Sequence, residues 1–327
     1  MLDRLVPPPE GLAFPEGTET VILDAADGIK LRSICIAPTV TPCRGTIFVL
    51  QGRAEFIEKF GEVFAKLLAR GFAVASLDWR GQGGSAHQLR NARKGHVEDF
   101  EDYLLDLDAL ITEARRRAMP EPYGLLAHST GCTIALMALV RAGSPFRRAV
   151  LSSPLVGISG WGGKPPARLL ARLLSSIGLS GAYVPGGGPK SGFEKPFEGN
   201  PFTGDPTRHA GVVQWLAAEP ALGIGDPTIG WADAAFEAMA KFAEPDFGQT
   251  NRTPILMTIA GDDAIVDSQA SAALAHRMRG ASAITLRGAR HEILMERDAI
   301  QTEFWAAFDA FMRFDPENEA APPTPLD

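Results

Sequence analysis

The sequence has little cysteine, no excess of positive charge and no long apolar run. Its three cysteines lack the spacing of a metal site, and an odd, sparse set is typical of a reducing compartment rather than of a disulfide framework. A net charge of −7 at pH 7 argues against a nucleic-acid binder, which needs a basic field. No apolar stretch could cross a bilayer, and residues 1–11 lack the apolar core of a signal peptide. We therefore expect a cytoplasmic protein.

The marks of nucleotide and metal sites are also missing. The glycine-dense loop at residues 80–84 lacks the lysine of a phosphate-binding loop and the glycine spacing of a dinucleotide site. No group of His, Asp and Glu residues shows metal-ligand spacing. We expect neither a cofactor nor a metal.

The pattern that is present is that of an α/β protein. Two alternating runs around Asp27-Gly28 predict a β-hairpin, and apolar runs then alternate with amphipathic stretches. Such alternation predicts a mostly parallel central sheet with helices on both faces. The expected strands are 20–23, 31–36, 46–50, 72–77, 123–127, 148–152, 254–259 and 282–286, and the expected helices include 97–117, 132–140, 269–278 and 298–314.

A shift in composition interrupts this alternation between residues 155 and 250. The segment is rich in Gly, Pro and aromatic residues, with helical patches at 165–177, 206–218 and 230–242 and no convincing strand. We interpret it as a helical cap inserted into one core, which comprises residues 1–154 and 251–315. The acidic, proline-rich residues 316–327 predict a disordered tail.

The most informative stretch runs from Leu125 to Cys132. An apolar strand ends at Ala127, Ser129 follows with Gly131 two residues on, and a buried helix begins directly afterwards. A serine at such a strand–turn–helix junction stands clear of the sheet, where a base can reach it. We predict that Ser129 is a catalytic nucleophile. The alternative is an ordinary turn with a solvated serine, because short patterns of this kind recur by chance.

Two loops late in the chain offer the other groups of a catalytic triad. Ligands of parallel α/β sheets bind beyond the carboxyl ends of strands, and residues 260–267 and 287–292 each follow such an end. The second loop contains His291, which would take the proton from Ser129 and later return it to the leaving group. Order along the chain leaves the acid open; the candidates are Asp262, Asp263, Asp267 and Glu292.

Five motifs are present in a characteristic order: Gln51-Gly52-Arg53-Ala54-Glu55, residues 78–85 (DWRGQGGS), Ala127-His128-Ser129-Thr130-Gly131, Asp263-Ala264-Ile265-Val266-Asp267 and Gly288-Ala289-Arg290-His291-Glu292. Together they resemble the α/β-hydrolases of the monoacylglycerol lipase and lysophospholipase L2 type, which are grouped with serine aminopeptidase-like hydrolases. The resemblance extends over about residues 21–314 and implies the α/β-hydrolase fold. The family pattern D-x-hydrophobic-x-D implies that Asp263 completes a triad with Ser129 and His291.

The resemblance also implies an oxyanion hole made of two backbone N–H groups, those of Arg53 and Thr130. The family usually has His-Gly in the first loop, whereas this chain has Gln51 and Gly52, which we count as substrate-binding candidates. Because the donors are backbone groups, the exchange of His for Gln does not abolish the hole. Arg53 is large and charged where the resembling lipases commonly carry a small residue. Its side chain therefore either folds away or faces an anionic group on the substrate.

Other features have a plainer interpretation. We interpret His128 as a packing residue that points away from Ser129, and His209 as a solvated helix position. The apolar stripe of residues 168–177 packs on the core, or else it covers an acyl-chain tunnel or rests on a membrane. Aromatic residues in the cap favour a substrate with an apolar portion; they are Trp161, Trp215, Trp231 and Phe236.

We therefore predict a serine hydrolase that cleaves lipid-derived carboxylic esters, a monoacylglycerol or a lysophospholipid, through an acyl-enzyme. Its partner would be a small-molecule ester or lipid, with peripheral membrane contact through the cap; the oligomeric state stays open. Alternatives are a short-chain carboxylesterase, a C–C or amide hydrolase with the same triad, and a non-catalytic binding protein on this scaffold. An epoxide hydrolase or dehalogenase is disfavoured, because those enzymes use an aspartate where Ser129 stands.

Overall fold

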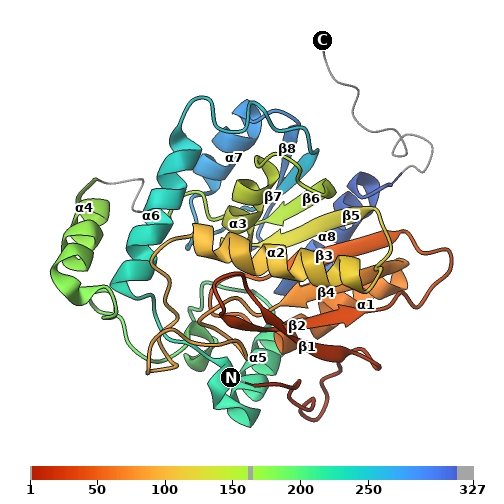
Figure 1. The fold of residues 1–327 in the computed structure, drawn as a ribbon, viewed down its shortest axis with the longest axis horizontal. Coiled ribbons are helices and arrows are strands. Elements are labelled where there is room, and N and C mark those ends of the chain that lie inside the picture. The colour runs from red at the N-terminus through yellow and green to blue at the C-terminus, as the bar shows by residue number, and fades with distance from the viewer. Residues whose placement is uncertain (1, 161–164, 315–327) are drawn as a thin grey trace.

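The centre of the molecule is an eight-stranded sheet, seen in the computed structural model, which describes residues 2–160 and 165–314 (Figure 1). The strands are β1 (Glu19–Asp24), β2 (Lys30–Ile36), β3 (Gly45–Leu50), β4 (Phe72–Leu77), β5 (Tyr123–His128), β6 (Phe146–Ser152), β7 (Ile255–Ala260) and β8 (Ala281–Leu286). Their order across the sheet is β1-β2-β4-β3-β5-β6-β7-β8. Trp161 and the predicted tail at 316–327 lie outside the described residues.

The direction of the strands confirms the predicted fold class. β1 and β2 form the expected antiparallel hairpin, and β2 also runs antiparallel to β4. All other neighbours are parallel. The inner strands β3, β4, β5 and β7 are buried at every residue, as strands covered on both faces must be. Every strand expected from the sequence is present to within two residues at each end.

Helices cover both faces of the sheet. The apolar sides of α1 (Gly61–Ala69) and α8 (Asp298–Phe311) belong to one core cluster. Those of α2 (Glu101–Arg116), α3 (Thr130–Leu139) and α7 (Ser268–Arg277) belong to a second cluster on the opposite face. Figure 1 shows α2 crossing in front of the sheet and α8 behind it. Residues of α3 are buried all round, which explains why its sequence is apolar on every side.

Residues 155–250 contribute helices and short turns. The helices are α4 (Pro165–Leu174), α5 (Pro206–Ala218) and α6 (Ile229–Ala243), which match the three helical patches of the sequence. In the described part of this segment, no residue joins the central sheet. Short helical turns lie at Ile57–Phe60, Ser175–Leu179, Gly192–Glu194, Pro220–Leu222 and Ile293–Met295. The division of the chain into a core and an inserted cap stays a prediction.

Side-chain capping explains where two of these helices begin. The carboxylate of Asp205 accepts hydrogen bonds from the N–H groups of Thr207 and Arg208, and Pro206 occupies the first helical position of α5. The hydroxyl of Thr228 caps α6 in the same way by accepting from Trp231. These caps place α6 with Trp231 directed toward the core, where it joins the cluster that contains α2.

Two expectations about this segment were wrong. The apolar stripe of α4 and of the turn after it does not pack on the core, because its side chains are exposed, with Leu169 at 70%, Leu173 at 56% and Ile177 at 63%. In Figure 1, α4 lies at the edge of the molecule beside α6. His209 is not solvated either, since its ring is buried against Phe193 and Phe197. Of the described helices, none combines the length and the apolar character needed to cross a bilayer.

Candidate active site

The backbone at Ser129 adopts a conformation that few residues other than glycine occupy. Its φ is 49° and its ψ is −115°, between the end of β5 and the start of α3. A Cβ atom added to Gly131 would lie 2.3 Å from the carbonyl oxygen of Leu50 and 2.6 Å from that of Gln51, so glycine is sterically required. The N–H of Ser129 donates to the carbonyl of Ser152 at 3.0 Å. These contacts hold the serine at the carboxyl edge of the sheet.

The structure brings Ser129, His291 and Asp263 into one hydrogen-bonded chain. His291 Nε2 lies 2.9 Å from Ser129 Oγ, and His291 Nδ1 lies 2.8 Å from Asp263 Oδ2. The other carboxylate oxygen of Asp263 accepts from the N–H groups of Ile265 and Val266. Burial alone would raise the pKa of Asp263, but the bonds from His291 and from the backbone outweigh it and hold the pKa below its usual value.

This arrangement determines what His291 can do. An ionised carboxylate only accepts hydrogen bonds, so Nδ1 carries the proton and Nε2 is left to accept from the serine hydroxyl. The imidazole is therefore oriented as a general base for Ser129. The geometry also separates Asp263 from the other candidate acids: Asp262 is exposed, Asp267 caps α7, and Glu292 pairs with Lys59.

The loop after β3 presents two backbone groups beside the serine. The N–H of Gly52 is occupied, because it donates to the carboxylate of Glu55. Among the described residues, the N–H groups of Arg53 and Thr130 have no hydrogen-bond acceptor, and Thr130 is the first residue of α3. Free N–H groups at a helix start and a neighbouring loop are suited to stabilise an oxyanion. A Cβ on Gly52 would lie 2.7 Å from Glu55 Oε2, so a side chain at this position would displace the carboxylate of Glu55.

Gln51, the other candidate of this loop, lies farther from the substrate space. Its side chain is fully buried, and it is not among the residues that line the cavity beside Ser129. Its carbonyl accepts from the indole N–H of Trp79 at 2.9 Å. The amide oxygen and nitrogen of its side chain have no hydrogen-bond partner in the described part of the chain. The predicted roles of Gln51, Gly52, Arg53 and Thr130 stay predictions.

A cavity of about 630 Å³ opens onto the serine. Ser129 is 8% exposed and His291 is 3% exposed, so a substrate reaches them only through this space. The core and the segment 155–250 both contribute to its wall. The apolar part of the wall includes Leu155, Ile158, Phe202, Trp231, Ala235 and Ile265.

A buried group of charges lies directly behind His291. Glu55 binds the ammonium group of Lys59, which also lies 2.7 Å from a carboxylate oxygen of Glu292. His128 Nδ1 lies 3.0 Å from Glu55 Oε2, and its Nε2 lies 3.2 Å from the backbone carbonyl oxygen of His291. We call Glu55, Lys59, His128 and Glu292 the charge cluster. It connects the loop after β3 with the loop that carries His291.

Both ring nitrogens of His128 face groups that only accept hydrogen bonds, a carboxylate and a carbonyl. Both must therefore donate, and the ring is an imidazolium. Burial would lower the pKa of His128, but Glu55 and Glu292 raise it to about 9. With this proton, the charge cluster contains two anions and two cations. The interpretation of His128 as a packing residue was wrong, because the turn at Ser129 leaves its side chain facing the loop of His291.

The charge cluster has the composition of a metal site but already holds a cation. One ligand atom each from Glu55, His128 and Glu292 could be chosen within 4.8 Å of one another. The ammonium group of Lys59, however, binds both carboxylates. The charges are therefore balanced by the protein itself, and a metal would have to displace Lys59.

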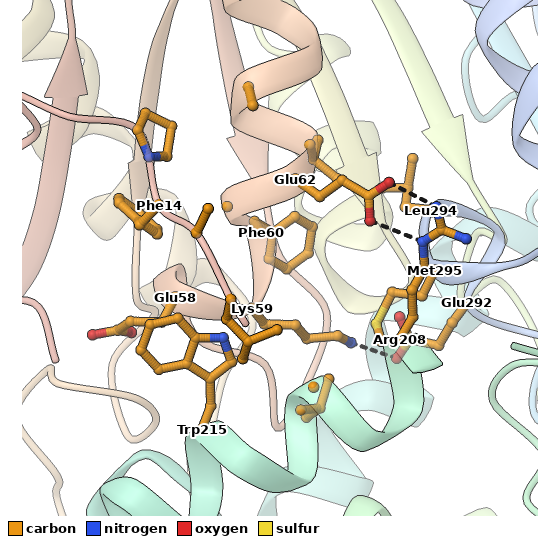
Figure 2. A pocket seen from close by; sticks show the side chains of 18 of the residues that line it. Phe14, Glu58, Lys59, Phe60, Glu62, Arg208, Trp215, Glu292, Leu294 and Met295 are labelled. Carbon is orange, nitrogen blue, oxygen red and sulfur yellow. Dashed lines mark hydrogen bonds and ion pairs between the residues drawn. The ribbon is translucent and has the colours of Figure 1, made fainter. Parts of the chain in front are cut away.

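A second cavity, of about 450 Å³, lies on the other side of the charge cluster (Figure 2). Figure 2 shows Lys59 and Glu292 in contact in its wall, with Phe60 and Trp215 nearby. Glu292 also lines the cavity beside Ser129. The ion pair between Lys59 and Glu292 thus forms part of the partition between the two spaces.

Sequence reasoning missed the charge cluster. Glu55 was part of a motif without a role, and Glu292 was considered only as a triad acid. The contacts of His128 join residues 73 and 163 positions apart, and no local pattern marks such pairs. The one available signal was the i, i+4 spacing of Glu55 and Lys59, which is too common on surfaces to indicate a buried pair.

Comparison with known proteins matches residues 41–298 to the family described as "Serine aminopeptidase, S33". A probable lysophospholipase L2 of Haemophilus influenzae is 28% identical over 305 residues, which cover 93% of this chain and 95% of the relative. Lysophospholipase L2 of Escherichia coli strain K12 is 27% identical over 268 residues, which cover 78% of this chain and 76% of the relative. A solved soluble variant of monoglyceride lipase from Saccharomyces cerevisiae has a TM-score of 0.73 at 18% identity, covering 93% of this chain and 99% of that one, and shares the fold.

The protonation of His128 predicts a pH dependence of stability. In the unfolded chain this residue has an ordinary pKa of 6.5, and in the folded chain a pKa of about 9. The stabilisation is therefore complete below pH 6.5 and is lost as pH rises through 9, by up to about 1.4 kcal/mol per pH unit. Urea unfolding across this interval should show the decline for the wild type. His128→Gln, which cannot titrate, should be less stable at low pH and show a flatter profile; parallel profiles would contradict the assignment.

Proposed function

Because the chain belongs to the serine aminopeptidase (S33) family, we propose that it is a serine hydrolase that cleaves lipid-derived carboxylic esters. The observation that carries the proposal is the hydrogen-bonded chain from Ser129 Oγ through His291 to Asp263, at 2.9 and 2.8 Å. The chain of bonds ends in a cavity large enough for an organic substrate.

The reaction follows from the positions of these groups. His291 Nε2 takes the hydroxyl proton as Ser129 Oγ attacks the ester carbonyl, and the oxyanion accepts hydrogen bonds from the N–H groups of Arg53 and Thr130. His291 then protonates the leaving alcohol, which departs and leaves the acyl group on Ser129. A water molecule gives its proton to His291 and attacks the acyl-enzyme. The acid departs, and Ser129 recovers its proton.

Two observations support a lipid as the substrate. The relatives named above are a lysophospholipase L2 and a monoglyceride lipase, and both names denote enzymes of lipids. The cavity beside Ser129 has an apolar wall that includes Leu155, Phe202 and Trp231, as an acyl chain requires. A short-chain carboxylesterase with the same triad is the second candidate, since the cavity alone does not select a chain length.

The exposed stripe on α4 supports contact with a lipid surface. Without such contact, Leu169, Leu170 and Leu173 of α4 would be exposed to water, as would Ile177 in the following turn, while α4 packs against α6. A helix with such a face can lie in the headgroup region of a membrane without crossing it. We propose that the enzyme is cytoplasmic and binds a membrane reversibly through this face.

A fluorophosphonate probe tests the nucleophile. Such probes phosphonylate a serine only when its hydroxyl is activated, so the wild type should be labelled and Ser129→Ala should not. Asp263→Asn should retain the fold but lower kcat by about four orders of magnitude, because the imidazole loses its orientation. Asp267→Asn is the matched control from the same loop and should stay active. Absence of labelling in folded wild-type protein would rule out the hydrolase proposal.

A series of monoacylglycerols of increasing chain length tests the lipid claim. Each buried CH₂ contributes about 0.8 kcal/mol, so kcat/KM should rise with chain length until the apolar wall is filled. The substrates are kept below their critical micelle concentrations, so that binding to aggregates does not contribute. A preference for acetyl or butyryl esters over longer ones would favour the carboxylesterase instead.

Vesicle binding tests the role of α4. The double variant Leu169→Ser/Leu173→Ser should bind phosphatidylcholine vesicles at least about tenfold more weakly than the wild type, because two apolar side chains no longer enter the bilayer. Val40→Ser removes an exposed apolar side chain of the core, 45% exposed, and is the control that should bind normally. Equal sedimentation of all three proteins with vesicles would contradict the proposed contact.

A further inference from the structure

Arg53 places an unpaired positive charge in the wall of the active-site cavity. Its Nε and Nη2 atoms have no exposed surface and no hydrogen-bond partner in the described residues. The contact the guanidinium does make is with an aromatic ring: Cζ lies 5.1 Å from the centroid of Trp231, on α6. Arg53 as a whole is partly exposed, and both Arg53 and Trp231 line the cavity beside Ser129, so the side chain lies along the wall of the substrate space.

Two fully buried arginines of the core are paired with carboxylates. Arg32 lies 2.7 Å from Glu58 and 2.6 Å from Asp78. Arg80 lies 2.7 Å from Asp106 and is likewise fully buried. These pairs follow the rule that a buried charge needs a partner of opposite sign, since an unmet charged donor is costly. Arg53 departs from the rule, and it does so in the wall of the substrate cavity.

The acids nearest to this cavity do not supply the missing partner. No described carboxylate lies within 4.0 Å of the Arg53 guanidinium, the limit for an ion pair. Asp226, which lines the cavity, instead accepts a hydrogen bond from the N–H of Gly188 at 2.9 Å. Glu292 is paired with Lys59. Burial lowers the pKa of Arg53 to about 10, yet the group remains charged at neutral pH. The cavity therefore offers a cation that an anionic ligand could pair with.

The position of Arg53 indicates which part of a substrate would reach it. The backbone N–H of the same residue faces the reacting carbonyl in the proposed mechanism, so the side chain starts beside the ester. The apolar wall accounts for the acyl chain. Because the acyl chain of a lipid ester is uncharged, an anionic group that reaches Arg53 close to the ester belongs to the alcohol. On a glycerol ester, the anion at that distance is a phosphate, whose oxygens match the planar donors of a guanidinium.

We propose that the guanidinium of Arg53 binds an anionic group on the alcohol portion of the substrate, a phosphate, and so selects phosphate-bearing lysolipids over uncharged monoacylglycerols. The inference rests on the proposed function for its catalytic readout. It assigns substrate choice to a side chain whose backbone belongs to the oxyanion hole.

The test compares two esters that share the same octanoyl chain and differ only in the phosphate: 1-octanoylglycerol and 1-octanoylglycerol 3-phosphate. The measured quantity is the ratio of their kcat/KM values, which cancels effects common to both reactions. In Arg53→Met, kcat/KM for the phosphate ester divided by kcat/KM for the neutral ester should fall by about tenfold to a hundredfold. This is the loss expected for hydrogen bonds to a charged group. The ratio for Arg53→Lys should lie between those of the wild type and Arg53→Met, because lysine keeps the charge but lacks the planar pair of donors.

Asp226→Asn is the matched control. It removes a charge of opposite sign from the same cavity and should raise the ratio. Fluorophosphonate labelling of each variant identifies any that fail to fold. An unchanged ratio in Arg53→Met, or an equal fall in Arg53→Met and Asp226→Asn, would overturn the proposal.

A 1-glycerol ester of a short dicarboxylic acid places the anion on the acyl side of the ester. A stronger dependence of kcat/KM on Arg53 for this ester would overturn the assignment of the anion to the alcohol.

Binding separates this inference from the proposed function. Calorimetric titration of Ser129→Ala with glycerol 3-phosphate requires no hydrolysis, and the expected result is binding that Arg53→Met weakens at least about tenfold in the same background. Glycerol should bind both proteins equally weakly. If glycerol 3-phosphate binds through Arg53 while no ester is cleaved, the proposed function fails and the inference stands. If esters are cleaved and glycerol 3-phosphate binds both proteins equally, the inference alone fails.

Discussion

The close approach of α3 to the end of β3 is the constraint on which the site depends. A side chain at Gly131 would collide with the carbonyl oxygens of Leu50 and Gln51, so the helix starts directly against the loop after β3. The chain accommodates this by placing Ser129 at a φ of 49°, a strain of about 1–3 kcal/mol that the buried helix and sheet stabilise. Ser129, the proposed nucleophile, and the two proposed backbone donors are thereby brought close together, whichever substrate arrives.

The charge cluster then joins the three loops that meet at this point. Glu55 binds the N–H of Gly52, and His128 bridges Glu55 to the carbonyl of His291. Because the members are buried, removing one would leave an uncompensated charge, at a cost of about 3–5 kcal/mol. The cluster therefore acts as a unit. It holds the loop of the oxyanion donors and the loop of the base in one register, while Lys59 and Glu292 close the partition to the second cavity.

Local patterns predicted the features that depend on neighbours in sequence. Apolar periodicity predicted the strands and most helices. The rule that sites lie beyond strand ends predicted the order of Ser129, an acid and His291. The exposure of α4 did not follow, because an amphipathic period shows that one face is apolar and not what covers it. The charge cluster did not follow either, since the pairing of His128 with Glu55 exists only after β3 and β5 become neighbours.

In the loop after β3, the backbone and the side chains have different proposed roles. A side chain at Gly52 would press on the carboxylate of Glu55 and on the Cβ of Ser129, so this position favours glycine. The side chains of Gln51 and Arg53 are not limited in this way, because the proposed oxyanion hole uses backbone N–H groups. Gln51 turns into the protein and Arg53 lines the cavity. In the proposed mechanism, a substitution at Arg53 therefore alters which substrates are accepted and leaves the backbone donors of the oxyanion hole in place.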